Sequence, residues 1–203
     1  MSSQPYPYSE RERLFLERYL DLLYAESSRR NVTRVPRAEA WARHVEESLD
    51  LVPLRDWSPG ERVLDLGSGG GIPGIPLAIV QPALSIGLIE RNQAKAAFLL
   101  TCLGQLDLPA VQVLARDALE LARSADFAAA DVLVSRAALP VLQLLRLAGR
   151  LLGEGGEGLV HVGVSVTVDA SVEAAASRAG VGRLKLETAG RSHLLRFVRL
   201  PRG

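Results

Sequence analysis

The residues best suited to chemistry gather in one glycine-rich stretch, VLDLGSGGGIPGIPL, which runs from Val63 to Leu77. Five of its glycines fall within eight positions, and glycine lets a backbone turn sharply or a ligand approach closely. An apolar run carrying Asp65 precedes these glycines, and a second acid, Glu90, ends the next apolar run. A carboxylate in that second position is suited to accept hydrogen bonds from ribose hydroxyls. The pattern predicts a loop that holds a nucleoside.

Two classes of ligand fit such a loop. Gly69, Gly71 and Gly74 match the G-x-G-x-x-G fingerprint of dinucleotide enzymes, which would make the chain an oxidoreductase. Pro73 argues against that class, because proline lacks the N–H that a pyrophosphate needs at a helix N-terminus. Asp65 would repel a phosphate but attract an ammonium group. S-adenosylmethionine carries an ammonium, a sulfonium and no phosphate, so the loop favours a class I methyltransferase.

Apolar runs alternate with helical patterns after residue 61 and predict the elements that position the loop. Strands are predicted at Arg62–Leu66, Leu84–Ile89, Val111–Ala115, Ala130–Ser135 and Leu159–Val164. Helices are predicted at Gly74–Val80, Gln93–Leu106, Pro140–Leu152 and Asp169–Ala179. Two final strands, Arg183–Thr188 and His193–Leu200, flank the turn AGRS and should pair antiparallel. We predict an α/β fold, with a doubly wound, mostly parallel seven-stranded sheet.

Helical spacing also marks the residues ahead of the loop. Glu10–Glu26 places Phe15, Tyr19, Leu22 and Leu23 on one helix face. A second helix is predicted from Pro36 to about Leu51, with Trp41, Val45, Ser48, Leu49 and Val52 pointing one way. We therefore divide the chain into a small helical N-terminal extension at 1–58 and a methyltransferase domain at 59–203, which together form one compact unit.

The bulk composition excludes several classes of protein. Of the 203 residues, 48% are hydrophobic and 23% charged, as in an ordinary globular protein. Cys102 is the single cysteine, which rules out an intramolecular disulfide or a thiolate metal cluster. The N-terminus lacks the pattern of a secretory signal, and no apolar run is long enough to span a bilayer. We expect a cytoplasmic monomer that binds neither a metal nor a membrane.

Several segments together resemble one family, the 16S rRNA 7-methylguanosine methyltransferases, also called the glucose-inhibited division protein B family. The segments are NVT (Asn31–Thr33), RHVEES (Arg43–Ser48), LDLGSGGGIPGIPL (Leu64–Leu77), K..FL (Lys95–Leu99), SRA (Ser135–Ala137) and HL (His193–Leu194). The Gly-Ile-Pro-Gly-Ile-Pro-Leu run is far more specific than a generic methyltransferase loop. The resemblance implies an enzyme that uses S-adenosylmethionine to methylate N7 of one guanosine in 16S rRNA, with the rRNA or the small ribosomal subunit as its partner.

The resemblance also assigns residues to the cofactor site. Carried over by position, the cofactor contacts fall at Gly67, Ile72, Asp117, Ala118 and Arg136. The fingerprint glycine Gly69 and our chemical argument for Asp65 and Glu90 complete the expected cofactor set: Asp65 for the methionine ammonium and Glu90 for the ribose. Guanine N7 keeps its lone pair free at neutral pH, so we expect no catalytic general base.

Four residues are candidates for positioning the substrate, and each also has a structural interpretation. His44 and Ser48 lie one helical turn apart and either pack the helix or line a pocket near the acceptor base. Asn31 either caps a turn or enters the site. Arg136 ends the fourth strand, at the edge where ligands of parallel sheets gather, although a surface ion pair would also explain an arginine there.

A local basic patch is needed for an RNA partner, because the formal net charge of the chain is only +1. The best candidates for phosphate contacts are Arg29, Arg30, Arg34, Arg37 and Arg43.

At two positions where the family usually has a positively charged residue, this chain has an uncharged one. The usual Lys-Gly pair on the fifth strand is Val162-Gly163 here, and an Arg-His pair near the end is Ser192-His193. Each departure removes a possible phosphate contact. Two alternatives to an rRNA enzyme therefore stay open: a methyltransferase-fold protein with a non-RNA substrate, and a binding module whose activity has decayed.

Overall fold

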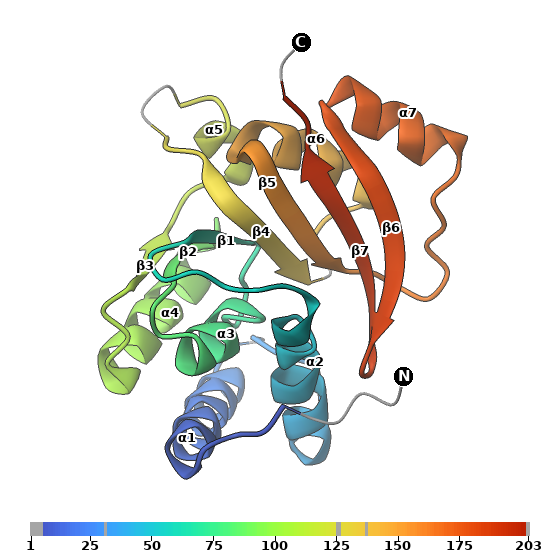
Figure 1. Cartoon of the computed structure of the whole chain (residues 1–203). Coiled ribbons are helices and arrows are strands. Elements are labelled where there is room, and N and C mark those ends of the chain that lie inside the picture. Colours follow the sequence, from blue (N-terminus) through green and yellow to red (C-terminus); the bar gives the residue numbers. More distant parts are fainter. Residues whose placement is uncertain (1–5, 31, 125–126, 137, 202–203) are drawn as a thin grey trace.

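A computed structural model of the chain describes residues 6–30, 32–124, 127–136 and 138–201. Within them, seven strands form one sheet in the order β3-β2-β1-β4-β5-β7-β6 (Figure 1). The strands are β1 (Arg62–Leu66), β2 (Ser85–Ile89), β3 (Val111–Leu114), β4 (Ala130–Arg136), β5 (Leu152–His161), β6 (Val181–Ala189) and β7 (Ser192–Arg199). Strand β7 runs antiparallel to both its neighbours, β5 and β6, and the other pairs are parallel. The predicted fold class is confirmed.

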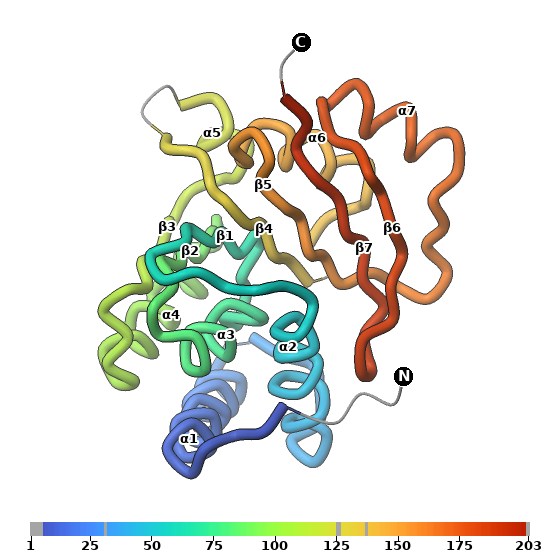
Figure 2. The backbone as a smooth tube through the Cα atoms, viewed as in Figure 1, coloured from blue at the N-terminus to red at the C-terminus, as the bar shows by residue number. Residues whose placement is uncertain are grey.

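Helices cover both faces of the sheet, as the alternation of apolar runs predicts. One face carries α1 (Glu10–Ser27), α3 (Gly74–Val80) and α4 (Gln93–Leu106), whose buried side chains form one hydrophobic cluster. The other face carries α5 (Ala118–Leu121), α6 (Val141–Leu151) and α7 (Ala170–Arg178), which belong to a second cluster. Figure 2 traces this path from the blue N-terminal helix to the red strand β7. The fold is therefore doubly wound.

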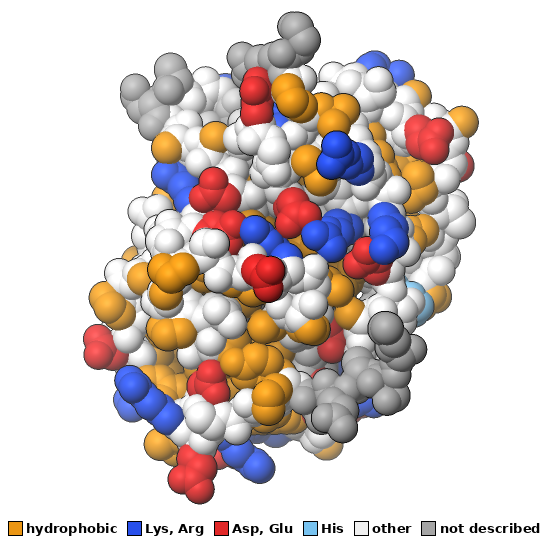
Figure 3. Space-filling view, viewed as in Figure 1, with side chains coloured by type: hydrophobic (Ala, Val, Ile, Leu, Met, Phe, Trp, Pro, Cys, Tyr) orange, Lys and Arg blue, Asp and Glu red, His pale blue; other side chains and the backbone are white. Residues whose placement is uncertain are grey.

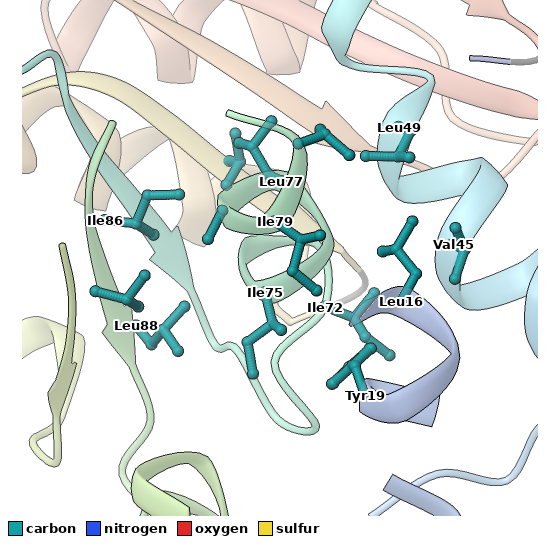
Figure 4. Packing of buried hydrophobic residues seen from close by; sticks show 14 of the residues in the cluster. Leu16, Tyr19, Val45, Leu49, Ile72, Ile75, Leu77, Ile79, Ile86 and Leu88 are labelled. Atoms are coloured by element: carbon teal, nitrogen blue, oxygen red, sulfur yellow. The ribbon is translucent and has the colours of Figure 1, made fainter. Parts of the chain in front are cut away.

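The first helix packs against the sheet domain through a face close to the predicted one. Helix α1 begins at a capping box in which Ser9 and Glu12 bind each other's backbone N–H groups. Its buried residues are Leu16, Tyr19, Leu20 and Leu23, while the predicted Phe15 and Leu22 lie at the margin and are only partly buried. Figure 4 shows Leu16 and Tyr19 beside Ile72 and Ile75 of the glycine loop and α3. The extension and the sheet domain thus share one core, and the division at residues 58 and 59 stays a prediction.

The second predicted helix is not one regular α-helix. Its residues wind first as a 3₁₀ turn, η1 (Arg37–Glu39), then as a π-helix, η2 (Trp41–Glu46), and then as α2 (Glu47–Leu49), before a further 3₁₀ turn, η3 (Val52–Leu54). Val45, Ser48 and Leu49 point inward, as predicted, and Val45 and Leu49 face the α3 core in Figure 4. Short π-helical turns occur often at functional sites.

Strand β5 differs most from its prediction, Leu159–Val164. It begins at Leu152, directly after α6, and ends at His161. Its glycine-rich first half has no apolar alternation, yet it pairs with β4 through a register shift between Ala130 and Val132. The sequence pattern therefore recognises only the buried second half of the strand.

Charged side chains of both signs form a band across the middle of the face shown in Figure 3. Four charged residues form a network of ion pairs: Arg55 contacts Glu61 at 2.6 Å and Glu157 at 3.2 Å, and Glu157 also contacts Arg196 at 2.7 Å. This network ties the end of the extension to β5 and β7. No helix in the described part of the chain is long and apolar enough to cross a membrane.

Candidate active site

The glycine loop follows β1 and leads into α3 at the carboxyl edge of the sheet. Gly67, Gly69 and Gly71 adopt φ values of +73°, +57° and +94°, which disfavour any residue with a side chain. A Cβ on Gly67 would lie 2.4 Å from the Cβ of Ala138, so packing also requires glycine there. A Cβ on Gly69 would meet no atom closer than 3.9 Å, so the loop faces open space at this point. Gly69 is where a ligand can approach the backbone.

Asp65 lies beneath this loop with its side chain fully buried. Its Oδ2 accepts a hydrogen bond from the Gly74 N–H at 3.1 Å, whereas Oδ1 has no partner among the described residues. Burial raises the pKa of the Asp65 carboxyl to about 7, against the opposing effect of the Gly74 N–H. A buried oxygen without a partner is costly, and a donor such as an ammonium group would satisfy it. The site therefore fits the methionine end of S-adenosylmethionine.

The start of α3 offers no hydrogen-bond donors to a phosphate. The Gly74 N–H binds Asp65, the Ile75 N–H binds the Gly71 carbonyl at 2.7 Å, and Pro76 has no N–H. Phosphates bind helix N-termini through free N–H groups, and here these groups are already used. The local geometry supports the predicted preference for a cofactor without phosphates.

Two further acids that were predicted to contact the cofactor lie at the ends of neighbouring strands. Glu90, after β2, accepts hydrogen bonds from the N–H groups of Gly69 at 2.9 Å and Asn92 at 2.7 Å. Each of its oxygens keeps a second lone pair that a ribose hydroxyl could use. Asp117, after β3, caps α5, which begins at Ala118. The predicted residues of β1, β2 and β3 thus lie along one edge.

Arg136 and His44 meet directly on the other side of the loop. Nη2 of Arg136 lies 2.9 Å from Nδ1 of His44, and Nε2 of His44 lies 2.8 Å from Oγ1 of Thr33. An arginine can only donate, so Nδ1 is the acceptor and the proton of the neutral ring sits on Nε2. The contact fixes one tautomer of His44.

His44 is held neutral by its surroundings. Burial, together with the positive charges of Arg136 and Arg43, lowers the pKa of His44 to about 4. The ring is 1% exposed. Near neutral pH it can accept at Nδ1 and donate at Nε2, but it does not titrate.

Glu47 joins this group, and our sequence reasoning missed it. Its side chain contacts Arg43 at 2.7 Å and Arg136 at 3.3 Å. Its backbone carbonyl accepts hydrogen bonds from Nε2 of His161 at 2.7 Å and from Oγ of Ser192 at 3.3 Å. The one signal in the sequence is the four-residue spacing of Arg43 and Glu47, which brings opposite charges together on a helix.

The remaining positioning candidates fall in different places. Ser48 is fully buried, and its hydroxyl donates to the His44 carbonyl at 2.7 Å, so it acts inside the helix. Asn31 lies outside the described residues. Ile72, which was predicted as a cofactor contact and not as a positioning residue, is 7% exposed and packs in the core beside α1.

The two departures from the family pattern also receive a structural account. Ser192 is 4% exposed and donates to Asp50 at 2.7 Å, so the side chain at this position points into the protein rather than toward an RNA. Val162 packs at the edge of the second hydrophobic cluster.

The basic cluster ahead of the loop divides into paired and unpaired arginines. Arg37 binds Asp21, Arg43 binds Glu47, and Arg30 binds Glu26 at 3.2 Å. Arg29 and Arg34 are exposed, and neither has a charged partner among the described residues. These two guanidinium groups are the ones available to an external anion.

The described residues next to these two arginines, 32 and 33, also touch the site. Thr33 binds His44, and a Cβ on Gly70 would lie 3.3 Å from Cγ1 of Val32. The Tyr19 hydroxyl donates to the Gly70 carbonyl at 2.8 Å. The extension therefore covers one side of the glycine loop.

A separate cavity of about 570 Å³ lies between α2, η3 and the turn that joins β6 to β7. Leu49, Val52 and Pro53 contribute to its apolar wall. None of the predicted cofactor residues lines it, so it is distinct from the cofactor edge.

Comparison with known sequences gives one consistent result. The family described as "GidB: rRNA small subunit methyltransferase G" matches residues 13–184. A relative from Solibacter usitatus, ribosomal RNA small subunit methyltransferase G, is 34% identical over 182 residues, covering 87% of this chain and 81% of the relative. The protein of the same name from Sorangium cellulosum is 40% identical over 131 residues, which cover 64% of this chain and 55% of that protein. The aligned part of the chain thus spans little more than half of the Sorangium protein.

Among solved structures, the E81Q mutant of MtNAS in complex with S-adenosylmethionine superposes with a TM-score of 0.62. The match covers 94% of this chain and 77% of that one, at 16% identity. At this identity, the likeness establishes the fold alone.

Proposed function

The chain belongs to the rRNA small subunit methyltransferase G family, and we propose that it transfers the methyl group of S-adenosylmethionine to N7 of a guanosine in 16S rRNA. The proposal rests on one observation. A glycine loop that leads into a helix with no free N–H groups for a phosphate and the Arg136–His44 pair lie together at one edge of the sheet. The loop would serve the cofactor, and Arg136, which is partly exposed, would lie beside the substrate base.

Asp65, Glu90 and the loop glycines would hold the cofactor. The unpartnered Oδ1 of Asp65 would accept from the methionine ammonium, and Glu90 would accept from the ribose. Gly69 lets the ligand lie against the backbone, and Asp117 with Ala118 borders the adenine. When bound, S-adenosylmethionine supplies a methyl group on a positively charged sulfur.

The transfer needs positioning rather than proton removal. Guanine N7 has a free lone pair at neutral pH, so no residue has to act as a base. Neutral His44 fits this chemistry, because it is a fixed, buried support for Arg136 that does not titrate near neutral pH. Arg136 contributes a positive charge that can orient an anionic or electron-rich group of the substrate or cofactor. Holding reactants at attack distance accounts for a large part of many enzymatic rate enhancements.

Arg29 and Arg34 are the proposed phosphate contacts for the rRNA. They lie next to residues 32 and 33, which touch Gly70 and His44, so an RNA bound there would reach the site. We further propose that the enzyme is a cytoplasmic monomer, with the helical extension at 1–58 as the RNA-facing part.

Nucleoside mapping tests the proposed function. Ribosomal RNA from a strain lacking the gene should lose one 7-methylguanosine in 16S rRNA, as detected by mass spectrometry of digested rRNA. The parent gene should restore it, and a gene encoding Asp65→Asn should restore it poorly. An unchanged set of methylated nucleosides in the deletion strain would instead favour a non-RNA substrate or a protein without activity.

A further inference from the structure

We infer that Glu47 is a positioning residue, whose carboxylate holds the Arg136 guanidinium against Nδ1 of His44 and thereby fixes the orientation and tautomer of His44 in the wall of the site. Glu47 does not itself line the cofactor loop, so its effect on methyl transfer runs through Arg136 and His44 and rests on the proposed function.

The first support is the placement of the charge. Glu47 is 7% exposed and lies between two arginines, with Oε1 toward Arg43 and Oε2 toward Arg136. The Arg136 guanidinium also donates to the Arg43 carbonyl through Nη1. An arginine held by a carboxylate on one side and a carbonyl on another has little rotational freedom left. Both of these contacts use Nη1, and the other terminal nitrogen, Nη2, is the one that meets His44.

The second support is the anchoring of Glu47 to the sheet. Its carbonyl accepts from His161, the last residue of β5, and from Ser192, the first residue of β7. Arg136 ends the neighbouring strand β4, which pairs with β5 through Arg136 and His161. The carboxylate and the guanidinium are thus both fixed relative to the same strand ends. These hydrogen bonds fix the position of the short helix α2 relative to the carboxyl edge of the sheet.

The third support is that the arrangement leaves one orientation for His44. Its ring contacts Arg136 through Nδ1 and Thr33 through Nε2, and the ring of Tyr24 lies 6.3 Å away. Without the donor at Nδ1, a neutral imidazole could carry its proton on either nitrogen. The pairing of Glu47 with Arg136 therefore selects the tautomer.

A substitution at Glu47 can shift the pKa of His44 in either direction, depending on whether Arg136 stays in place. Arg136 and Arg43 carry positive charge, and Glu47 carries the negative charge that pairs with both. Loss of this negative charge alone would lower the pKa of His44 further. Departure of Arg136 would instead raise it, because a nearby positive charge would be gone.

The test uses the full-length protein with Glu47→Gln, and Glu47→Asp as the conservative variant. The matched control is Glu46→Gln, which removes the adjacent carboxylate, whose partner is Arg191. Nitrogen-15 NMR of the three histidine rings, with His44 assigned by His44→Gln, reports tautomer and pKa without any substrate. In parallel, kcat and the KM for RNA are measured at saturating cofactor.

We expect the parent and Glu46→Gln to show a single Nε2–H tautomer for His44. Glu47→Gln should show mixed tautomers and a raised pKa for His44, with kcat lowered about 10- to 100-fold and the KM for RNA changed less than threefold. Glu47→Asp should recover part of both signals. A single Nε2–H tautomer in Glu47→Gln, or an equal response of Glu46→Gln, would overturn the inference. Absence of rRNA methylation by the parent would overturn the proposed function while the NMR result still decides the role of Glu47.

Discussion

Binding of S-adenosylmethionine should depend on pH through Asp65. The carboxyl is buried and its pKa is raised to about 7, so near neutral pH a substantial fraction of the free protein carries a protonated, uncharged Asp65. Only the ionised form attracts the ammonium group. Affinity should therefore rise as pH increases through 7, and binding should release a proton.

The magnitude follows from the fraction ionised. With a pKa of about 7 in the free protein, about one tenth of Asp65 is ionised at pH 6, so binding there should be about tenfold weaker than binding to the fully ionised carboxyl, or about 1.4 kcal/mol. At pH 7, binding should release roughly half a proton. The amino group of the ligand loses its own proton near pH 8, so affinity should decline again at higher pH.

Titration calorimetry in buffers of different ionisation enthalpy measures both quantities. Asp65→Asn keeps an oxygen for the Gly74 N–H but carries no charge, so it should lose the pH dependence below 7.5. Its affinity at pH 7.5 should fall by roughly 1.5–3 kcal/mol, the range of a charge-assisted hydrogen bond. Asp21→Asn, an exposed aspartate paired with Arg37, is the control variant.

A second ligand separates the ammonium contact from other effects of pH. 5′-Methylthioadenosine lacks the amino-acid part, so its affinity should not change between pH 6 and pH 8. The reasoning fails if the parent binds S-adenosylmethionine equally well at pH 6 and pH 7.5, or if 5′-methylthioadenosine shows the same dependence.

Three further results are expected. The rate of single-turnover methyl transfer at saturating RNA and cofactor should be nearly independent of pH between about pH 6 and pH 9, because the pKa of His44 is lowered to about 4. A rate that rises with an apparent pKa of about 6.5 in the parent, but not in His44→Gln, would contradict this. Replacing Arg29 and Arg34 with alanine should reduce the log–log salt slope of RNA binding by about two, one unit per lost phosphate contact, whereas Arg150→Ala on α6 should leave the slope unchanged. Ser192→Arg should lower the free energy of unfolding by at least about 2 kcal/mol, because the position is buried against α2; an unchanged melting temperature would show that an arginine there reaches solvent.

The sheet and the cofactor loop were predictable because their signals are local. Continuous apolar runs such as Arg62–Leu66 and a capped helix such as Gln93–Leu106 match the structure at both ends. The preference against phosphate followed from two prolines and one acid. The structure supplies the reason, because the first N–H groups of α3 are bound by Asp65 and Gly71.

The substrate side was less predictable because long-range contacts determine it. A pattern of apolar residues with a period near 3.6 cannot distinguish an α-helix from the π-helix at Trp41–Glu46. Glu47 and His161 are 114 positions apart, and their contact depends on the pairing of β5 with β4. Ser192 appeared as a lost cation in the sequence, whereas its burial shows that the position serves the docking of α2.

The glycines of the loop are required for reasons that differ from one position to the next. Gly69 borders open space, while a Cβ on Gly74 would lie 2.7 Å from the Asp65 carboxylate and one on Gly70 would lie 2.8 Å from Leu23 of α1. Position 70 is thus restricted by the N-terminal helix and not by a ligand. A homologue that lost this helix would lose the closest contact at position 70, leaving Cγ1 of Val32 at 3.3 Å, whereas the restrictions at positions 69 and 74 would be unchanged. One glycine of the loop is therefore explained mainly by packing against a helix some fifty positions earlier in the chain.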